Sequence, residues 1–160
     1  MNLGLVGKAE LAPDALDATG ETLGACFSGM WWDSPARRLY GLADRGPLDG
    51  HLDYHPRVHE FSLSVDLIGQ PKLALSNTIT RLLRDERGCV FTGHDPGDKN
   101  ANERSASGSR SIDPEAIVCA PDGSFYVSDE YGPYVYHFDA SFQMVDHIEP
   151  PPISCRNVVA

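Results

Sequence analysis

The residues of this sequence best suited to chemistry are carboxylates at the base of a predicted β-hairpin. The turn signal Pro121-Asp122-Gly123 separates an apolar run, residues 117–120, from a run rich in β-formers, residues 124–129. If the last two residues of this signal form a two-residue loop, Glu115 lies opposite Glu130. Two carboxylates that face each other across a ladder repel unless one is protonated or a cation lies between them.

A weak copy of this hairpin occurs earlier in the chain. Residues 28–47 align without a gap to residues 114–133. Identical residues stand at aligned positions: Pro35 and Pro121, Tyr40 and Tyr126, Gly46 and Gly132, Pro47 and Pro133. A supersecondary unit that recurs along a chain usually stacks beside its copies, because it cannot bury its own apolar face. The repeat therefore favours a solenoid or a propeller.

One register applied to both hairpins predicts further facing pairs: Ala116 with Asp129, Gly29 with Asp44, and Ser28 with Arg45. Both copies would then present charged groups at one rim. Clustered carboxylate oxygens of this kind suit Ca²⁺ or Mg²⁺ better than zinc. The alternative is that Glu115 and Glu130 extend into water at a sheet edge, because a register shift of one residue would separate them.

The strand pattern predicts an all-β fold with β-propeller-like antiparallel blades. Strand-like runs continue after the hairpins, at residues 57–67, 134–139 and 144–148. Four short antiparallel strands in roughly 40 residues match one propeller blade. A closed propeller needs about four blades or more. We therefore expect residues 1–160 to form a single partial domain, an incomplete propeller from a fragment or truncated chain.

A long mobile loop is predicted within this domain at residues 93–112. Its sequence from Gly93 to Ser111 contains no aliphatic residue larger than alanine and is rich in Gly, Ser, Asn and Asp. Because the loop leads directly to Asp113, its polar residues are candidates for a substrate-facing lid: His94, Asp95, Asp98, Arg104 and Arg110. The alternative is a solvated surface loop.

Composition narrows the possible partners. The net charge of −10 and the pI near 4.8 argue against nucleic acid as a partner, because such binding draws on positive patches. The apolar runs are far shorter than the ~20 residues of a membrane helix, so no membrane partner is expected. Residues 1–8 show no secretory signal. The four cysteines have no CxxC spacing, which excludes a zinc ribbon and leaves disulfides open.

Familiar catalytic motifs do not occur in the sequence. There is no GxSxG elbow, SxxK, HExxH or glycine-rich phosphate loop. His51, His55 and His59 recur at helical spacing, but Pro56 and the strand pattern after it exclude a helical metal face. The chemistry of the chain therefore rests on its carboxylates and arginines.

Three segments resemble a known family. FSGMWWDSPARRLYGLADRGP, RVHEFSL and SIDPEAIVCAPDGSFYVSDEYGPYVYHFDASFQMV are similar to the phytase-like family, also called esterase-like activity of phytase. The match covers about residues 27–150, and its most specific parts are Asp44-Arg45-Gly46, Asp113-Pro114-Glu115 and residues 129–133. Ala116 departs from the glycine that is usual in the family. Members are longer, usually exported, and expected to form β-propellers.

The resemblance implies hydrolysis of a phosphate or carboxylate ester of a small molecule. In a mechanism consistent with it, one or two Ca²⁺ ions would bind to the rim carboxylates: Asp44, Glu115, Asp129 and Glu130. Glu115 would be central to catalysis, Arg45 would neutralise a phosphate group, and Arg110 would assist it. Two alternatives stay open, a noncatalytic propeller that binds a partner or glycan with structural calcium, and a calcium-dependent lactonase-type propeller.

Overall fold

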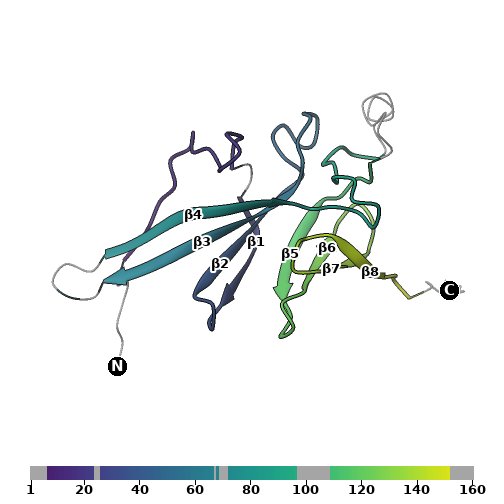
Figure 1. The fold of residues 1–160 in the computed structure, drawn as a ribbon. Helices are drawn as coiled ribbons and strands as arrows, with labels where there is room; N and C mark the ends of the chain where they lie inside the picture. The colour runs from purple at the N-terminus through teal and green to yellow at the C-terminus, as the bar shows by residue number, and fades with distance from the viewer. Residues whose placement is uncertain (1–6, 24–25, 67, 69–71, 97–108, 152–160) are drawn as a thin grey trace, which may run out of the picture.

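The computed structural model of the chain describes residues 7–23, 26–66, 68, 72–96 and 109–151. They form two antiparallel four-strand sheets and no helix (Figure 1). The all-β prediction is therefore confirmed. No helix in these residues is long and apolar enough to cross a membrane.

Each sheet is a meander in which strands that follow one another in sequence lie side by side. The first sheet contains β1 (Cys26–Asp33), β2 (Arg38–Ala43), β3 (Arg57–Asp66) and β4 (Lys72–Leu82). The second contains β5 (Pro114–Cys119), β6 (Phe125–Asp129), β7 (Val135–Phe138) and β8 (Met144–Ile148). The aligned segments 28–47 and 114–133 thus contain the first hairpin of each sheet.

One hydrophobic core joins the two sheets. Leu42 and Val58 come from the first sheet, Val127 and Phe138 come from the second, and Phe91 comes from the chain between them. All five are fully buried. Because residues from both sheets share this core, burial of apolar area fixes the first hairpin of one sheet against that of the other.

Strand β1 lies directly against β5, as Figure 1 shows, and this contact needs a glycine. A Cβ atom added to Gly29 would lie 2.9 Å from the Ala116 Cα atom and 3.0 Å from the Glu115 carbonyl oxygen. Just before this point β1 contains a bulge, in which Phe27 adopts φ 76°. A positive φ is strained for an aromatic residue, and bulges often redirect side chains beside functional sites.

The predicted register of the second hairpin is wrong by one residue. Cys119 pairs with Phe125 and Ala116 with Ser128, so the loop is three residues long rather than two. Gly123 has φ +85° at its third position, which fits a turn that ends in a left-handed residue. A bulge at Glu115 then pairs Pro114 with Asp129.

Consequently Glu115 does not face Glu130 across the ladder, and Ala116 does not face Asp129. The register of the first hairpin also differs from the predicted register. Gly29 pairs with Leu42 rather than Asp44, because the turn spans residues 34–37 and shifts the register by two positions. Ser28 lies in the β1 bulge rather than opposite Arg45.

The cysteines that the structure describes are free. Cys26, Cys89 and Cys119 form no disulfide and are partly buried. Burial raises the pKa of the Cys26 thiol to about 12, so it stays protonated. Cys119 lies in β5, as expected for a thiol that packs as a small apolar group. Cys155 lies outside the described residues.

A buried ion pair attaches the N-terminal segment to β3. The Arg57 Nη1 atom donates to Asp17 Oδ2 at 2.9 Å, and both side chains are almost fully buried. Burial alone would raise the pKa of Asp17. Hydrogen bonds from Thr19 and Arg57 outweigh it, so the pKa is lowered.

We predict that Asp17→Ala lowers the free energy of unfolding by about 3 kcal/mol, because it leaves the Arg57 charge buried without a partner. Since the folded pKa of Asp17 is depressed, its contribution is present above the unfolded pKa and is lost as pH falls through the folded pKa. Urea denaturation from neutral to acidic pH measures both effects. Asp14→Ala, at an exposed position of the same segment, is the control. Equal losses in the two variants would refute the prediction.

Candidate functional site

Three carboxylates converge where the first hairpins of the two sheets meet. Asp44 follows the last residue of β2, Asp113 precedes β5, and Glu115 lies in the bulge near the start of β5. One oxygen atom of each lies within 4.8 Å of the others. We call Asp44, Asp113 and Glu115 the acidic cluster. It exists because β1, β2 and β5 pack together.

Asp113 is the buried member of the acidic cluster, with 1% of its surface exposed. Neither of its carboxylate oxygens accepts a hydrogen bond from the described residues. Arg45 Nη1 lies 2.8 Å from Oδ2, which is ion-pair distance, but the approach lacks hydrogen-bond geometry. Burial raises the pKa of Asp113, and nearby Asp44 raises it further, while Arg45 opposes both. A buried carboxylate of this kind is incomplete without a further cation or proton.

Glu115 is the exposed member of the cluster and links it to β1. The Ser28 hydroxyl, in the β1 bulge, donates to Glu115 Oε2 at 3.2 Å. Partial burial and a hydrogen bond shared with Glu130 raise the pKa of Glu115, and Ser28 lowers it. Glu130 is therefore a neighbour of Glu115, although the two do not pair across the ladder.

Asp129 lies outside the acidic cluster and organises the backbone beside it. Its Oδ1 atom accepts hydrogen bonds from the backbone N–H groups of Asp113, at 2.9 Å, and Tyr131, at 3.1 Å. Burial raises its pKa, and these hydrogen bonds oppose the rise. The backbone N–H of Glu130 donates to the carbonyl of Asp113 at 2.9 Å. Asp129 and Glu130 thus hold Asp113 in position.

Arg45 is the cation of this region. It forms ion pairs with Asp113 and Asp49, and its guanidinium lies 5.7 Å from the centre of the Tyr131 ring. A hydrogen bond with Tyr131 raises the pKa of Arg45, and the carboxylates of Asp113 and Asp49 raise it further against the effect of burial. Arg45 therefore stays charged and neutralises part of the acidic cluster.

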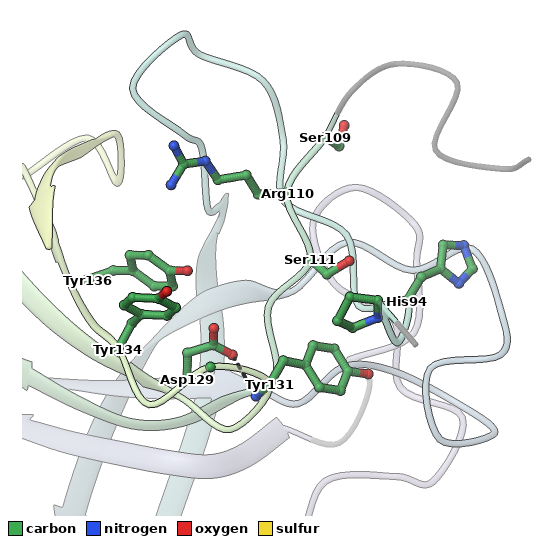
Figure 2. Close-up of a pocket in the computed structure, with 10 residues that line it drawn as sticks. His94, Ser109, Arg110, Ser111, Asp129, Tyr131, Tyr134 and Tyr136 are labelled. Atoms are coloured by element: carbon green, nitrogen blue, oxygen red, sulfur yellow. Dashed lines mark hydrogen bonds between the residues drawn. The ribbon is translucent and has the colours of Figure 1, made fainter. Parts of the chain in front are cut away.

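Arg110, the other predicted catalytic arginine, does not pair with the acidic cluster. Its Nη2 atom lies 2.8 Å from Glu86 Oε1. Arg110 lines a separate cavity of about 360 Å³, together with Asp129 and three tyrosines (Figure 2). Tyr131 lies between the acidic cluster and this cavity, because its ring packs against Arg45 and also lines the cavity.

The predicted loop at residues 93–112 is described only at its two ends, and residues 97–108 lie outside the described part. The ends meet in a parallel bridge between Thr92 and Ser111. His94, one of the proposed lid residues, is buried, and its Nδ1 atom lies at hydrogen-bond distance, 2.9 Å, from the carbonyl oxygen of Gly50. His94 is thus held in the loop base, and its predicted role in a lid stays a prediction.

Sequence reasoning missed Asp113 and Ser28 as members of the site. Asp113 precedes the strand, so a ladder register could not place it. The signal available was its position in Asp-Pro-Glu, because the following proline restricts Asp113 to an extended conformation beside the strand. For Ser28 the available signal was Gly29, the residue after it. This glycine permits the close approach of β1 to β5 that brings Ser28 to Glu115.

Comparison with known proteins agrees with the family resemblance. Residues 22–156 match the family model described as Phytase-like: Esterase-like activity of phytase. The chain is 31% identical over 187 aligned residues to a protein of Arthroderma benhamiae described as an uncharacterized secreted protein. The match covers 92% of this chain and 36% of that relative, so the chain spans about a third of the relative's length. No solved structure matches the chain significantly.

We predict that Asp113→Asn stabilises the protein in the presence of a chelator by on the order of 1 kcal/mol, because the amide carries no charge to bury. The same substitution should abolish any stabilisation by added Ca²⁺. Thermal unfolding with chelator and with Ca²⁺ measures both. Asp49→Asn is the control, since Asp49 also pairs with Arg45 but is exposed. Loss of stability in chelator, with the Ca²⁺ response retained, would contradict the prediction.

Proposed function

Because this chain belongs to the phytase-like family, we propose that it is part of a hydrolase that cleaves a phosphate or carboxylate ester of a small molecule with the help of Ca²⁺. The observation that carries the proposal is the buried carboxylate of Asp113, which lies within the acidic cluster and accepts no hydrogen bond from the described residues, although Arg45 lies at ion-pair distance. Such a group calls for a cation ligand or for a proton.

The donor set of the acidic cluster fits Ca²⁺. All three side chains offer carboxylate oxygens, which are the ligands that calcium prefers, and neither sulfur nor imidazole is among them. Glu130, which shares a hydrogen bond with Glu115, is available to complete the set. The proposed ligands are therefore Asp44, Asp113 and Glu115, with Glu130 beside them. Asp129, which the sequence suggested as a ligand, instead supports the backbone of Asp113.

Each polar residue of the site has a proposed task. Bound at the acidic cluster, Ca²⁺ would polarise the ester oxygen and lower the pKa of an attacking water. Arg45 would neutralise negative charge on the substrate, since its guanidinium lies at the cluster and stays ionised. Ser28 would orient Glu115 through its hydrogen bond. Arg110 would contact a more distant part of the substrate from the cavity wall.

For the whole protein we propose a β-propeller of which this chain is a part. Two four-strand meanders that share one core are what two neighbouring blades would look like. The weak repeat of residues 28–47 at 114–133 supports the same arrangement, and the chain spans 36% of its relative. Residues 1–160 would then form one partial domain, with the loop at 93–112 inside it. The name of the relative supports export from the cell.

We predict that Glu115→Gln lowers kcat/KM for ester hydrolysis by about 100-fold or more, because it removes a carboxylate at the reacting centre. It should also weaken Ca²⁺ binding. Assays with nitrophenyl phosphate and nitrophenyl acetate, with and without chelator, measure the first effect, and isothermal titration with Ca²⁺ measures the second. Glu149→Gln, at an exposed position beyond β8, is the control.

Other outcomes of the same assays would replace the proposal. Tight Ca²⁺ binding without hydrolysis of either ester would indicate a binding module with structural calcium. Hydrolysis of a simple lactone, with both nitrophenyl esters left intact, would indicate a lactonase. Ester hydrolysis unaffected by both chelator and Glu115→Gln would show that the acidic cluster is not the active site.

A further inference from the structure

A second feature near the acidic cluster is the cavity of about 360 Å³ that Tyr134 and Tyr136 wall on one side. Figure 2 shows the two rings lying over one another, and their centres are 5.9 Å apart at 25°. Asp129 and Tyr131 lie below the rings in this view, and Ser111 and Arg110 lie across the cavity from them. The lining is completed by His94, Pro96, Ser109 and Gly132. The volume is within the range of small-molecule sites.

The polar groups that line this cavity are mostly hydroxyls. Burial, together with the nearby charge of Asp129 and a hydrogen bond to it, raises the pKa of Tyr136 to about 12, so its hydroxyl stays protonated. Its O–H group donates to Asp129, and its oxygen is left to accept a hydrogen bond from a ligand. The Tyr134 and Ser111 hydroxyls add further neutral groups. Hydroxyls beside aromatic rings match a ligand that has an apolar ring face and a hydroxylated edge.

The charges around the cavity argue against a ligand with several phosphate groups. Its lining contains one arginine, Arg110, which already pairs with Glu86. Asp129 lies in the lining itself. A polyanion would meet the Asp129 carboxylate here, and the arginine of the lining is already neutralised by Glu86.

We propose that this cavity binds a neutral polyhydroxylated ring, a sugar or an unphosphorylated cyclitol. The inference rests on the proposed function in one respect, that the ring is the alcohol part of the ester cleaved at the acidic cluster. The two places adjoin, because Asp129 lines the cavity and accepts a hydrogen bond from the Asp113 backbone. Binding of the ring and hydrolysis of the ester are separately measurable.

The proposal is tested by measuring how the full chain binds three compounds: glucose, myo-inositol and inositol hexakisphosphate. Saturation-transfer NMR and isothermal titration measure the binding. Both neutral rings should bind, and the hexakisphosphate should bind more weakly than either in the presence of chelator. Ser111→Leu, which fills the cavity, should weaken binding of the neutral rings by about tenfold through lost hydrogen bonds. Tyr134→Phe, which keeps the ring and removes one hydroxyl, should weaken it less.

Ser64→Leu makes the same chemical change at an exposed position of β3 and should leave binding unchanged. Circular dichroism and thermal unfolding show whether each variant folds. The proposal is overturned if the neutral rings do not bind, if the hexakisphosphate binds more tightly than they do, or if Ser64→Leu and Ser111→Leu act alike. Ring binding without ester hydrolysis would refute the proposed function and leave this site in place. Ester hydrolysis without ring binding would refute the proposed ring site and leave the proposed function in place.

Discussion

The site depends on one constraint, the burial of the Asp113 carboxylate. Placing a carboxylate in a protein interior is unfavourable unless hydrogen bonds or opposite charges compensate it. Here the compensation is incomplete, since Arg45 approaches one oxygen atom outside hydrogen-bond geometry and Asp44 and Glu115 add like charge. Asp129 and Glu130 meanwhile bind the backbone on both sides of the Asp113 side chain and hold it in place. The fold thus maintains an arrangement that a cation would complete.

The contact between β1 and β5 produces this arrangement. Gly29 lets the two strands approach, and the bulge before it directs Ser28 toward Glu115. A second bulge, at Glu115, turns that side chain out of the ladder and toward Asp44 and Asp113. Strain at Phe27 is retained because its ring packs on Phe61, with ring centres 5.2 Å apart. Local irregularities in two otherwise regular hairpins therefore build the site.

Local signals in the sequence located most of the strands, but they located neither β4 nor the register of the hairpins. Turn residues and alternation located the β5–β6 hairpin and strands β3, β7 and β8 to within a few residues, because these signals are local. The loop at Gly123 has three residues rather than two, and no local pattern reveals the bulges at Ser28 and Glu115. Glu115 and Asp44 were expected as metal ligands at one rim and lie together in the acidic cluster, whereas Asp113 joins the cluster through tertiary packing. Arg110 was expected beside them and instead pairs with Glu86.

The central claim is that the acidic cluster binds a divalent cation with Asp113 as its buried ligand. Crystals of the full chain grown with Ca²⁺, or soaked with Tb³⁺ as its anomalous scatterer, test this claim directly. If Asp113 is a ligand, one strong anomalous peak lies about 2.3–2.6 Å from carboxylate oxygens of Asp44, Asp113 and Glu115. In the same crystals the Arg45 guanidinium should lie farther from Asp113 than 2.8 Å. A cluster without a peak at saturating metal, with Arg45 still against Asp113, would contradict it.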